Sequence, residues 1–238
     1  MLAGNSRRTF MSANSNSKTE FQNHFADRDE AARLLARKLA NCDVVDPIVL
    51  AIPRGGVGMA TIIAGVIGGV ADVVLVKKIG HPQNPEVAIG SVTEDGQILL
   101  REGLRESGLK LEEIQPLALK AIQEIERQRR LYTPDREPQK VSGREVVIVD
   151  DGIATGATMK AAIQSVRSGG AERILVASPV ASREAVENLI EEGVEIVLLA
   201  LPAVFSTVSH FYEDFSDVED SDVIATLKPK ANPSRQYQ

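Results

Sequence analysis

The fold of this chain is decided by the stretch from Val146 to Thr158, which reads Val-Val-Ile-Val-Asp-Asp-Gly-Ile-Ala-Thr-Gly-Ala-Thr. Its first four residues are apolar and mostly β-branched, a composition that is typical of a short strand buried on both faces. A helical pattern of apolar residues begins at Thr158, so the residues in between form a turn from a strand into a helix. Turns of this kind bind ligands in parallel α/β sheets.

The turn has the composition of a phosphate-binding loop. Gly152 and Gly156 let the backbone curl so that successive N–H groups point into one concavity, which suits an anion. Thr155 and Thr158 add hydroxyl donors, and the positive end of the helix dipole lies behind the loop. The sequence therefore predicts a phosphate site directly after the central strand.

Two acids, Asp150 and Asp151, stand between the strand and this loop. An isolated Asp-Asp pair at a strand end is more often solvated than functional. Here the apolar strand, the paired acids and the loop occur together, and carboxylates beside a phosphate site would hold ribose hydroxyls or a hydrated Mg²⁺. This combination indicates a sugar phosphate as the ligand.

The complete run resembles the phosphoribosyl pyrophosphate (PRPP) motif of type I phosphoribosyltransferases, and the resemblance extends from about Asp27 to Asp217. It is closest to the group often called only predicted phosphoribosyltransferases. It implies an α/β fold with a Rossmann-like, mainly parallel sheet, helices on both faces, a hairpin with a mobile loop and a small C-terminal hood. One departure is Gly152, where the family more often has an aliphatic residue.

The resemblance also implies roles for individual residues. Asp150 and Asp151 would act in catalysis and hold Mg²⁺ as the cofactor. The loop that would bind the substrate consists of Gly152, Ile153, Ala154, Thr155, Gly156, Ala157 and Thr158. The implied reaction moves phosphoribose from PRPP to a nucleobase or a similar acceptor and releases pyrophosphate. Such a reaction needs charge neutralisation at the pyrophosphate, a fixed ribose and the exclusion of water.

Several positions bear on the acceptor and on competing hypotheses. Ala154 stands where hypoxanthine-guanine enzymes of the family carry an aspartate, which argues against purine chemistry of that type. Adenine-type enzymes have alanine there and a glutamate in the mobile loop, for which Glu86 and Glu94 are candidates. The main alternative is a PRPP-binding regulator without turnover. A receiver-like fold with Asp150 as phosphate acceptor would require a different motif around the acids.

A second strand-turn-helix unit lies upstream of the central motif. Residues 48–52 are apolar and run into the turn Pro53–Gly56, which precedes a helix rich in small residues. Taken alone, this turn is equally well explained as a glycine turn with a surface arginine. Beside the PRPP motif it resembles the pyrophosphate loop of the same family, in which the peptide is often a non-proline cis bond. The resemblance therefore assigns Arg54, Gly55 and Gly56 to substrate binding.

The next predicted strand, over residues 71–76, ends at Lys77 and Lys78. Lysines at a strand exit are usually solvated, but basic residues at this exit approach the pyrophosphate in the family that the chain resembles, which implies catalytic roles for both. Residues 80–86 have the turn-forming composition of a mobile loop. A hairpin is expected over residues 88–100, so the loop would act as a lid on a hairpin base.

The rest of the chain alternates helices and strands. A long amphipathic helix is predicted from Leu111 to Leu131, and its basic end either complements the helix dipole or reaches a phosphate or a partner subunit. After the central motif the pattern predicts strands over residues 174–177 and 194–201, with a helix capped by Ser182 between them. This alternation predicts a mainly parallel sheet with right-handed crossovers.

Composition bounds the class of protein. The 238 residues carry a net charge of −6, which fits one main domain and argues against a nucleic-acid binder. Cys42 is the single cysteine, and His24, His81 and His210 lack metal-ligand spacing. No apolar run is long enough to cross a membrane. We therefore expect a cytoplasmic protein, and the resemblance adds PRPP, a small-molecule acceptor and a homodimer partner.

The two ends differ from the domain between them. Residues 1–20 are rich in serine and asparagine, which predicts a disordered extension, with a transit peptide as the alternative. The domain is expected over residues 21–222, and residues 223–238 form a C-terminal tail. Aromatic residues cluster after Pro202, and among them Phe205 resembles the phenylalanine that stacks on the base in purine-salvage enzymes. A packing role for this ring is the alternative.

Overall fold

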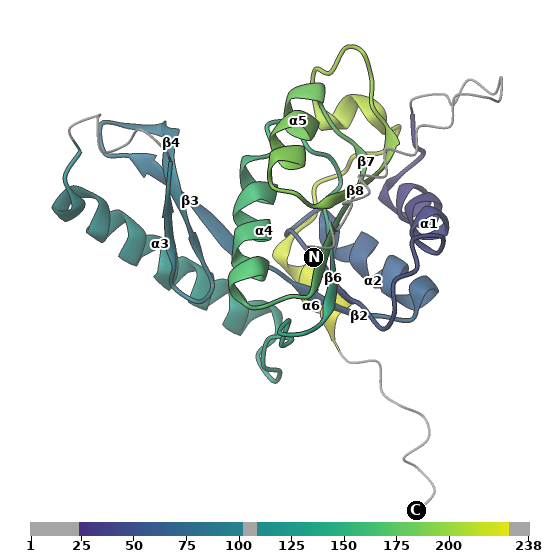
Figure 1. Cartoon of the computed structure of the whole chain (residues 1–238), viewed down its shortest axis with the longest axis horizontal. Helices are drawn as coiled ribbons and strands as arrows, with labels where there is room; N and C mark the ends of the chain where they lie inside the picture. Colours follow the sequence, from purple (N-terminus) through teal and green to yellow (C-terminus); the bar gives the residue numbers. More distant parts are fainter. Residues whose placement is uncertain (1–23, 102–108, 229–238) are drawn as a thin grey trace, which may run out of the picture.

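The computed structural model describes residues 24–101 and 109–228, and the N-terminal extension expected over residues 1–20 lies outside them. Figure 1 shows two parts, a body built on a parallel sheet and an arm that projects to one side of it. The two predicted ligand loops belong to the body, whereas the predicted hairpin belongs to the arm.

The body is built on a five-stranded sheet in which every neighbouring pair is parallel. In spatial order its strands are β2 (Val70–Val73), β1 (Ile48–Ala51), β6 (Glu145–Val149), β7 (Arg173–Val180) and β8 (Glu195–Ala200). The chain builds outward in one direction from β1 and in the other from β6, so the sheet has a switch point between these two strands. Ligands of open α/β sheets bind beyond the carboxyl ends of the strands at such a point, and both predicted loops lie there.

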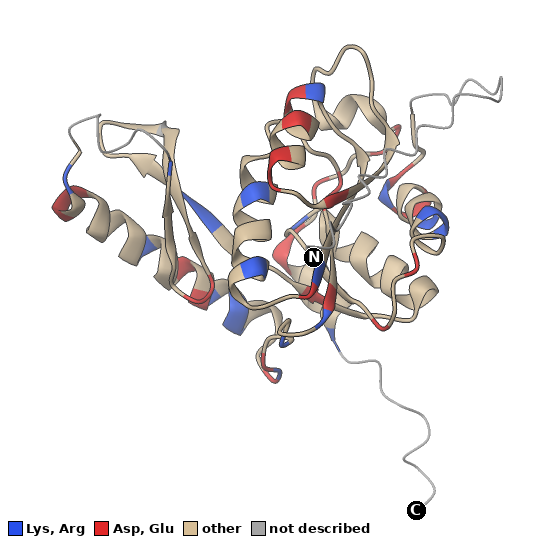
Figure 2. Cartoon of the chain, viewed as in Figure 1, with Lys and Arg blue, Asp and Glu red and all other residues tan. Residues whose placement is uncertain are grey.

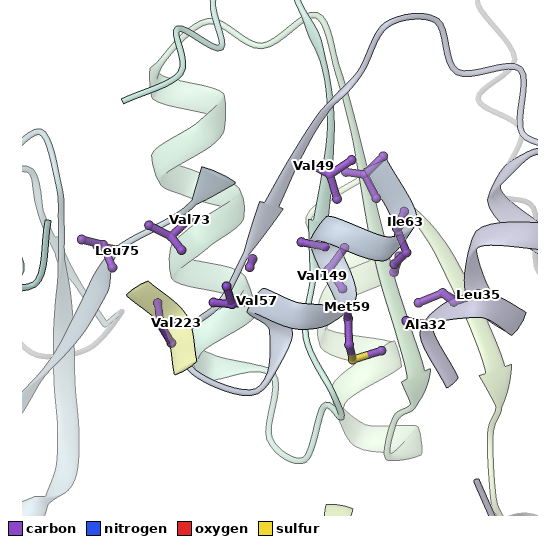
Figure 3. Close-up of a cluster of buried hydrophobic side chains, with 14 of the residues drawn as sticks. Ala32, Leu35, Val49, Val57, Met59, Ile63, Val73, Leu75, Val149 and Val223 are labelled. Atoms are coloured by element: carbon purple, nitrogen blue, oxygen red, sulfur yellow. The ribbon is translucent and has the colours of Figure 1, made fainter. Parts of the chain in front are cut away.

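Helices cover both faces of this sheet. They are α1 (Arg28–Leu39) and α2 (Gly56–Ile67) on one face, and α4 (Ala157–Ser168) and α5 (Arg183–Glu191) on the other. Because successive side chains of a strand point to opposite faces, Val49 packs with α1 and α2 (Figure 3), whereas Leu50 packs with α4 and α5. The predicted α/β fold with helices on both faces is confirmed.

The arm consists of an antiparallel sheet and one long helix. Its elements are β3 (Val76–His81), β4 (Asn84–Thr93), β5 (Ile98–Leu100) and α3 (Leu111–Tyr132). The hairpin and the long helix agree with the sequence, but the mobile loop expected over residues 80–86 is wrong. These residues form the ends of β3 and β4 and the tight turn between them. Gly80 is needed for close pairing of the strands, because a Cβ there would lie 2.4 Å from the carbonyl oxygen of Pro85.

At the start of the arm, the strands differ from those expected from the sequence. The strand predicted over residues 71–76 is divided, because β2 belongs to the parallel sheet of the body and β3 to the sheet of the arm. Lys77 and Lys78 therefore lie inside β3 and not at the exit of a strand. The apolar run conceals this division, since the two residues at the junction, Val74 and Leu75, are as buried as those of a strand.

A buried ion network fixes the arm to the body. Arg129 of α3 donates to Asp72 of β2 at 3.0 Å and to Glu94, which follows β4, at 2.6 Å. Arg129 also donates to the carbonyl oxygen of Val73 at 2.9 Å, and Arg136 donates to Asp72 at 2.8 Å. Asp72 is only 1% exposed, so its charge depends on these two arginines for compensation.

The C-terminal segment returns across the body. It contains a 3-10 helix, η2 (Val208–Phe211), and a short helix, α6 (Asp220–Leu227). Tyr212 forms a bridge with the start of the described chain, and Val223 is buried in the same cluster as α1 and α2 (Figure 3). The domain end expected at residue 222 falls inside α6, and the helix continues to Leu227 with Val223 in the core.

Charged side chains of both signs are scattered over the body and the arm (Figure 2). Basic and acidic residues stand together on α1, α3 and α5, whereas α4 carries only basic residues, so any binding site for an anion depends on local arrangement. None of the helices in the described parts of the chain is long and apolar enough to cross a lipid bilayer.

Candidate functional site

The loop after β6 is held in place by β7 and by the start of α5. The N–H of Ile153 donates to the carbonyl oxygen of Val180 at 2.9 Å, and the Ser182 hydroxyl donates to the carbonyl oxygen of Ala154 at 2.6 Å. Gly156 has a φ of 77°, a left-handed conformation that glycine adopts without steric cost. The shape of the loop is therefore determined by its neighbours.

The same loop presents backbone donors to its surroundings. Among the described residues, the N–H groups of Ala154, Thr155 and Gly156 have no protein acceptor, and the first turn of α4 follows directly. The Thr155 and Thr158 side chains are exposed. Unpaired amides and hydroxyls at a helix N-terminus are a favourable environment for a phosphate, and the phosphate site stays a prediction.

Asp150 and Asp151 lie at the carboxyl end of β6, beside the switch point of the sheet. The N–H of Asp151 donates to Oδ1 of Asp150 at 3.0 Å. Burial raises the pKa of Asp150 well above its ordinary value, and the charge of Asp151 acts in the same direction. A bound cation would offset this cost, because it favours the ionised carboxylate.

Asp151 has two partners that sequence analysis missed. Arg28, the first residue of α1, donates from Nε to Oδ2 of Asp151 at 2.8 Å. The Tyr212 hydroxyl donates to the carbonyl oxygen of Asp151 at 2.6 Å. These partners are 123 and 61 residues away in the sequence. Asp27 caps the start of α1, but nothing local in the sequence indicates which residue Arg28 contacts.

The loop after β1 touches the acids. A Cβ on Gly55 would lie 1.9 Å from Oδ2 of Asp151, and a Cβ on Gly56 would lie 2.7 Å from a backbone oxygen of β6. Neither position accepts a side chain unless its neighbour moves. The peptide bond between Pro53 and Arg54 is cis, as the resemblance implies. The two predicted motifs are therefore in direct contact.

A cavity of about 540 Å³ lies where the body meets the arm. Arg54 from the loop after β1, Lys77 from β3 and Arg127 from α3 line it, together with Thr158 at the start of α4. Lys78 is exposed and does not line the cavity, because alternate residues of a strand point to opposite faces. The structure thus brings three cations together and separates the two neighbouring lysines.

The arginines of the cavity already have acidic neighbours. Arg127 forms two hydrogen bonds of 2.9 Å with Glu124, one turn earlier in α3. Arg54 lies 3.8 Å from Asp220, the first residue of α6. The sequence left the basic end of this helix with either a helix-dipole role or a contact to a phosphate or partner subunit, because the helical pattern does not tell which side of α3 faces the body.

Three other residues named from the sequence are Phe205, Glu94 and Glu86, of which Phe205 and Glu94 are not among the residues that line the cavity. The Phe205 ring packs on Phe211, with 5.4 Å between the ring centroids, and does not line the cavity. Its stacking on a base stays a prediction. Glu94 is paired with Arg129, and the side chain of Glu86 is outside what the structure describes.

The departure from the family at Gly152 has a counterpart in the C-terminal segment. A Cβ on Gly152 would lie 2.4 Å from Cγ1 of Val208 in η2. Val208 of the C-terminal segment thus packs against Gly152, the loop position at which the family more often has an aliphatic residue. The sequence does not reveal this exchange, since the two residues are far apart along the chain.

Any metal ion at the acids would need further ligands. No cluster of three or more His, Cys, Asp or Glu side chains suited to a metal is present in the described ranges. Mg²⁺ commonly binds through one or two carboxylates together with substrate phosphates and water. Asp150 and Asp151 fit this mode, because they are adjacent at the carboxyl end of β6 and the Asp150 carboxylate accepts only one hydrogen bond among the described residues.

Comparison with known proteins agrees with this geometry. The family model of the phosphoribosyl transferase domain matches residues 17–198. A Mycobacterium tuberculosis protein, whose name assigns it to the phosphoribosyl transferases without a substrate, is 37% identical over 204 residues, which are 85% of this chain and 46% of that protein. The chain therefore spans less than half the length of this curated relative.

Two further relatives extend the comparison. The crystal structure of TT1426 from Thermus thermophilus has a TM-score of 0.79 and 42% sequence identity, and the match covers 86% of this chain and 97% of that one. A uracil phosphoribosyltransferase of Staphylococcus saprophyticus is 34% identical over 85 residues, which are 35% of this chain and 41% of that enzyme. The match of the family model over most of the sequence shows that this chain belongs to the phosphoribosyl transferase domain family.

Proposed function

We propose that this protein transfers phosphoribose from Mg²⁺-bound PRPP to a nitrogen of a small acceptor, such as a nucleobase, with release of pyrophosphate. The observation that supports this most is the contact between the two loops, in which Gly55 lies against Asp151 at the switch point of the sheet. PRPP has a phosphate at one end of its ribose and a pyrophosphate at the other. Two acids followed by a phosphate-type loop after β6, and a cavity with three cations that begins at the loop after β1, match that pattern of charge.

The residues after β6 hold the sugar end of PRPP in this proposal. The loop from Thr155 to Thr158 binds the 5′-phosphate through its backbone N–H groups and hydroxyls. Asp150 and Asp151 hold the ribose hydroxyls and Mg²⁺. When bound, Mg²⁺ supplies charge neutralisation for the leaving pyrophosphate.

The cavity between the body and the arm receives the pyrophosphate. Arg54, Lys77 and Arg127 line it, and two of these three cations come from the arm. Negative charge grows on the pyrophosphate as its bond to the ribose breaks. Fixed cations therefore stabilise the transition state more than the ground state, which is the requirement for acceleration of the reaction.

A PRPP-binding regulator without turnover is the second candidate function. It is favoured by Asp220, which lines the cavity 3.8 Å from Arg54 and would compete with pyrophosphate for that cation. Both candidates share the same PRPP site. The identity of the acceptor and assembly as a homodimer stay predictions from the resemblance.

Two measurements test the proposal and separate the candidates. Calorimetric titration with PRPP, with and without Mg²⁺, should show binding that requires the metal. Incubation with PRPP, Mg²⁺ and a panel of nucleobases should then release pyrophosphate with one class of base. Binding without release by any base would favour the regulator, and a lack of PRPP binding would contradict both.

A further inference from the structure

Arg28 joins three parts of the molecule at the acid pair. Its Nε donates to Oδ2 of Asp151 at 2.8 Å, and its Nη1 donates to the carbonyl oxygen of Ser216 at 2.8 Å. The guanidinium carbon lies 3.8 Å from the centroid of the Phe215 ring, which is a cation–π contact. The Arg28 and Asp151 side chains are only 17% and 13% exposed. The start of α1, the loop after β6 and the C-terminal segment therefore meet at one largely buried guanidinium.

Both the side chain and the backbone of Asp151 are held by neighbouring residues. Besides Arg28, its Oδ2 faces the backbone at Gly55, where a Cβ would lie 1.9 Å away. Its carbonyl oxygen accepts the Tyr212 hydroxyl at 2.6 Å. Asp150 differs, because among the described residues its carboxylate accepts one hydrogen bond, from the N–H of Asp151. The two acids are thus unequal, and Asp151 is the one whose orientation the protein determines.

We propose that Arg28 is a positioning residue, which holds Asp151 by its Oδ2 and thereby sets the geometry of the acid pair for ribose and Mg²⁺. This inference rests on the function proposed above. Arg28 acts through Asp151 and has no part in bond making or breaking. Outer partners of metal-binding side chains orient those ligands, and their loss typically lowers metal affinity or activity by about 10- to 100-fold.

A purely structural role for Arg28 would have different consequences. In that case the guanidinium would only tie α1 to the C-terminal segment through Phe215 and Ser216. Its loss would lower thermal stability, and any folded variant would bind PRPP as the parent does. PRPP affinity and melting temperature, measured on the same variants, therefore distinguish the two roles.

The first experiment is calorimetric titration of the full chain with PRPP in the presence of Mg²⁺. Arg28→Gln should bind PRPP about tenfold more weakly or worse. Arg28→Lys should recover part of this loss, because an ammonium still meets Asp151 but lacks the planar fork that reaches Ser216 at the same time. Arg33→Gln is the matched control, since Arg33 is exposed on the same helix and pairs only with Asp29 at 3.3 Å among the described residues. It should bind as the parent does.

A double variant tests whether Arg28 acts through Asp151. Arg28→Gln combined with Asp151→Asn should bind PRPP no more weakly than Asp151→Asn alone. Additive losses would overturn the inference. Phe215→Leu removes the ring contact and keeps the ion pair, so we expect a lower melting temperature with parental affinity. A loss of affinity in Phe215→Leu equal to that in Arg28→Gln would also overturn it.

The outcome for the parent separates this inference from the proposed function. A parent that does not bind PRPP contradicts the proposed function itself. A parent that binds PRPP, together with an Arg28→Gln variant of equal affinity, overturns only the positioning role.

Discussion

The body and the arm hold their residues in place by different means. In the body, β6 is covered on both faces by helices, and four of its five residues are buried. In the arm, one helix serves a three-stranded sheet, and Ile98 and Leu100 remain 42% and 39% exposed. The arm is joined to the body by the buried network around Arg129 and Asp72. The candidate site lies where the body and the arm meet.

This difference divides the site into two halves. The body supplies the acids and the phosphate loop, whose positions depend on backbone contacts and on close approach at Gly55. The arm supplies the cations Lys77 and Arg127, whose positions depend on where the arm is attached. Substitutions in the body half should therefore weaken ligand binding by changing the shape of the backbone. Substitutions in the arm half should weaken it by removing positive charge.

The largest effect is expected where the arm is attached. Arg129→Ala leaves Asp72 and Glu94 without a shared partner in a largely buried place, so it should lower the free energy of unfolding by about 3–5 kcal/mol. Chemical denaturation measures this change. Arg130→Ala is the control, since Arg130 is 72% exposed, and should change little. Equal stability of the two variants would mean that the network does not fix the arm.

A methyl group at Gly55 should damage the body half of the site. Gly55 has ordinary helical angles, so the effect of Gly55→Ala comes from the clash with Oδ2 of Asp151. Overpacking costs about 1–3 kcal/mol, and the same free energy taken from binding corresponds to roughly fivefold to 150-fold weaker PRPP binding by calorimetry. Gly58→Ala is the matched control, because nothing lies within 4 Å of its Cβ. It should keep parental affinity, with a gain in stability of up to about 1 kcal/mol.

The two lysines of β3 test the arm half of the site. Lys77 lines the cavity and Lys78 does not, so Lys77→Ala should raise the KM for PRPP by about tenfold or more, whereas Lys78→Ala should leave it nearly unchanged. Steady-state kinetics or PRPP titration measures the ratio. If the two variants behave alike, the arm does not present Lys77 to the ligand.

The smallest effect concerns the stability of the ligand-free protein. Burial raises the pKa of Asp150 in the folded state above its ordinary value of 3.8, so the folded protein binds more protons there than the unfolded chain. Stability contributed by this group is therefore lost as the pH rises from the unfolded pKa through the folded one. Asp150→Asn should melt at a higher temperature than the parent at neutral pH, and the difference should shrink as the pH falls toward the ordinary value.

The Asp151→Asn variant is the comparison for the melting temperature of Asp150→Asn. Asp151→Asn weakens the contact with Arg28, so it should lower the melting temperature at neutral pH. Both variants should bind PRPP and Mg²⁺ more weakly. A lower melting temperature in Asp150→Asn would contradict the assignment of Asp150 as the acid that is costly to bury.

The sequence by itself determined the body and the location of the ligand loops. Strands that are buried on both faces are mostly apolar, and β1 and residues 146–149 of β6 therefore stand out as runs of Ile, Val, Leu and Ala. The loop after β6 has two acids followed by two glycines and a threonine, and the loop after β1 has a proline and an arginine before two glycines. Both compositions reflect local backbone needs. Both kinds of signal lie within a few residues, so one sequence is enough to recognise them.

Only the tertiary structure decided where the arm begins, which lysine faces the cavity and what holds Asp151. The division between β2 and β3 depends on which sheet each half joins, and the apolar run is the same in either case. Arg28, Tyr212 and Val208 reach the acids and their loop from segments far apart in the sequence. Local periodicity records which face of an element is buried, but it does not record which distant residue that face meets.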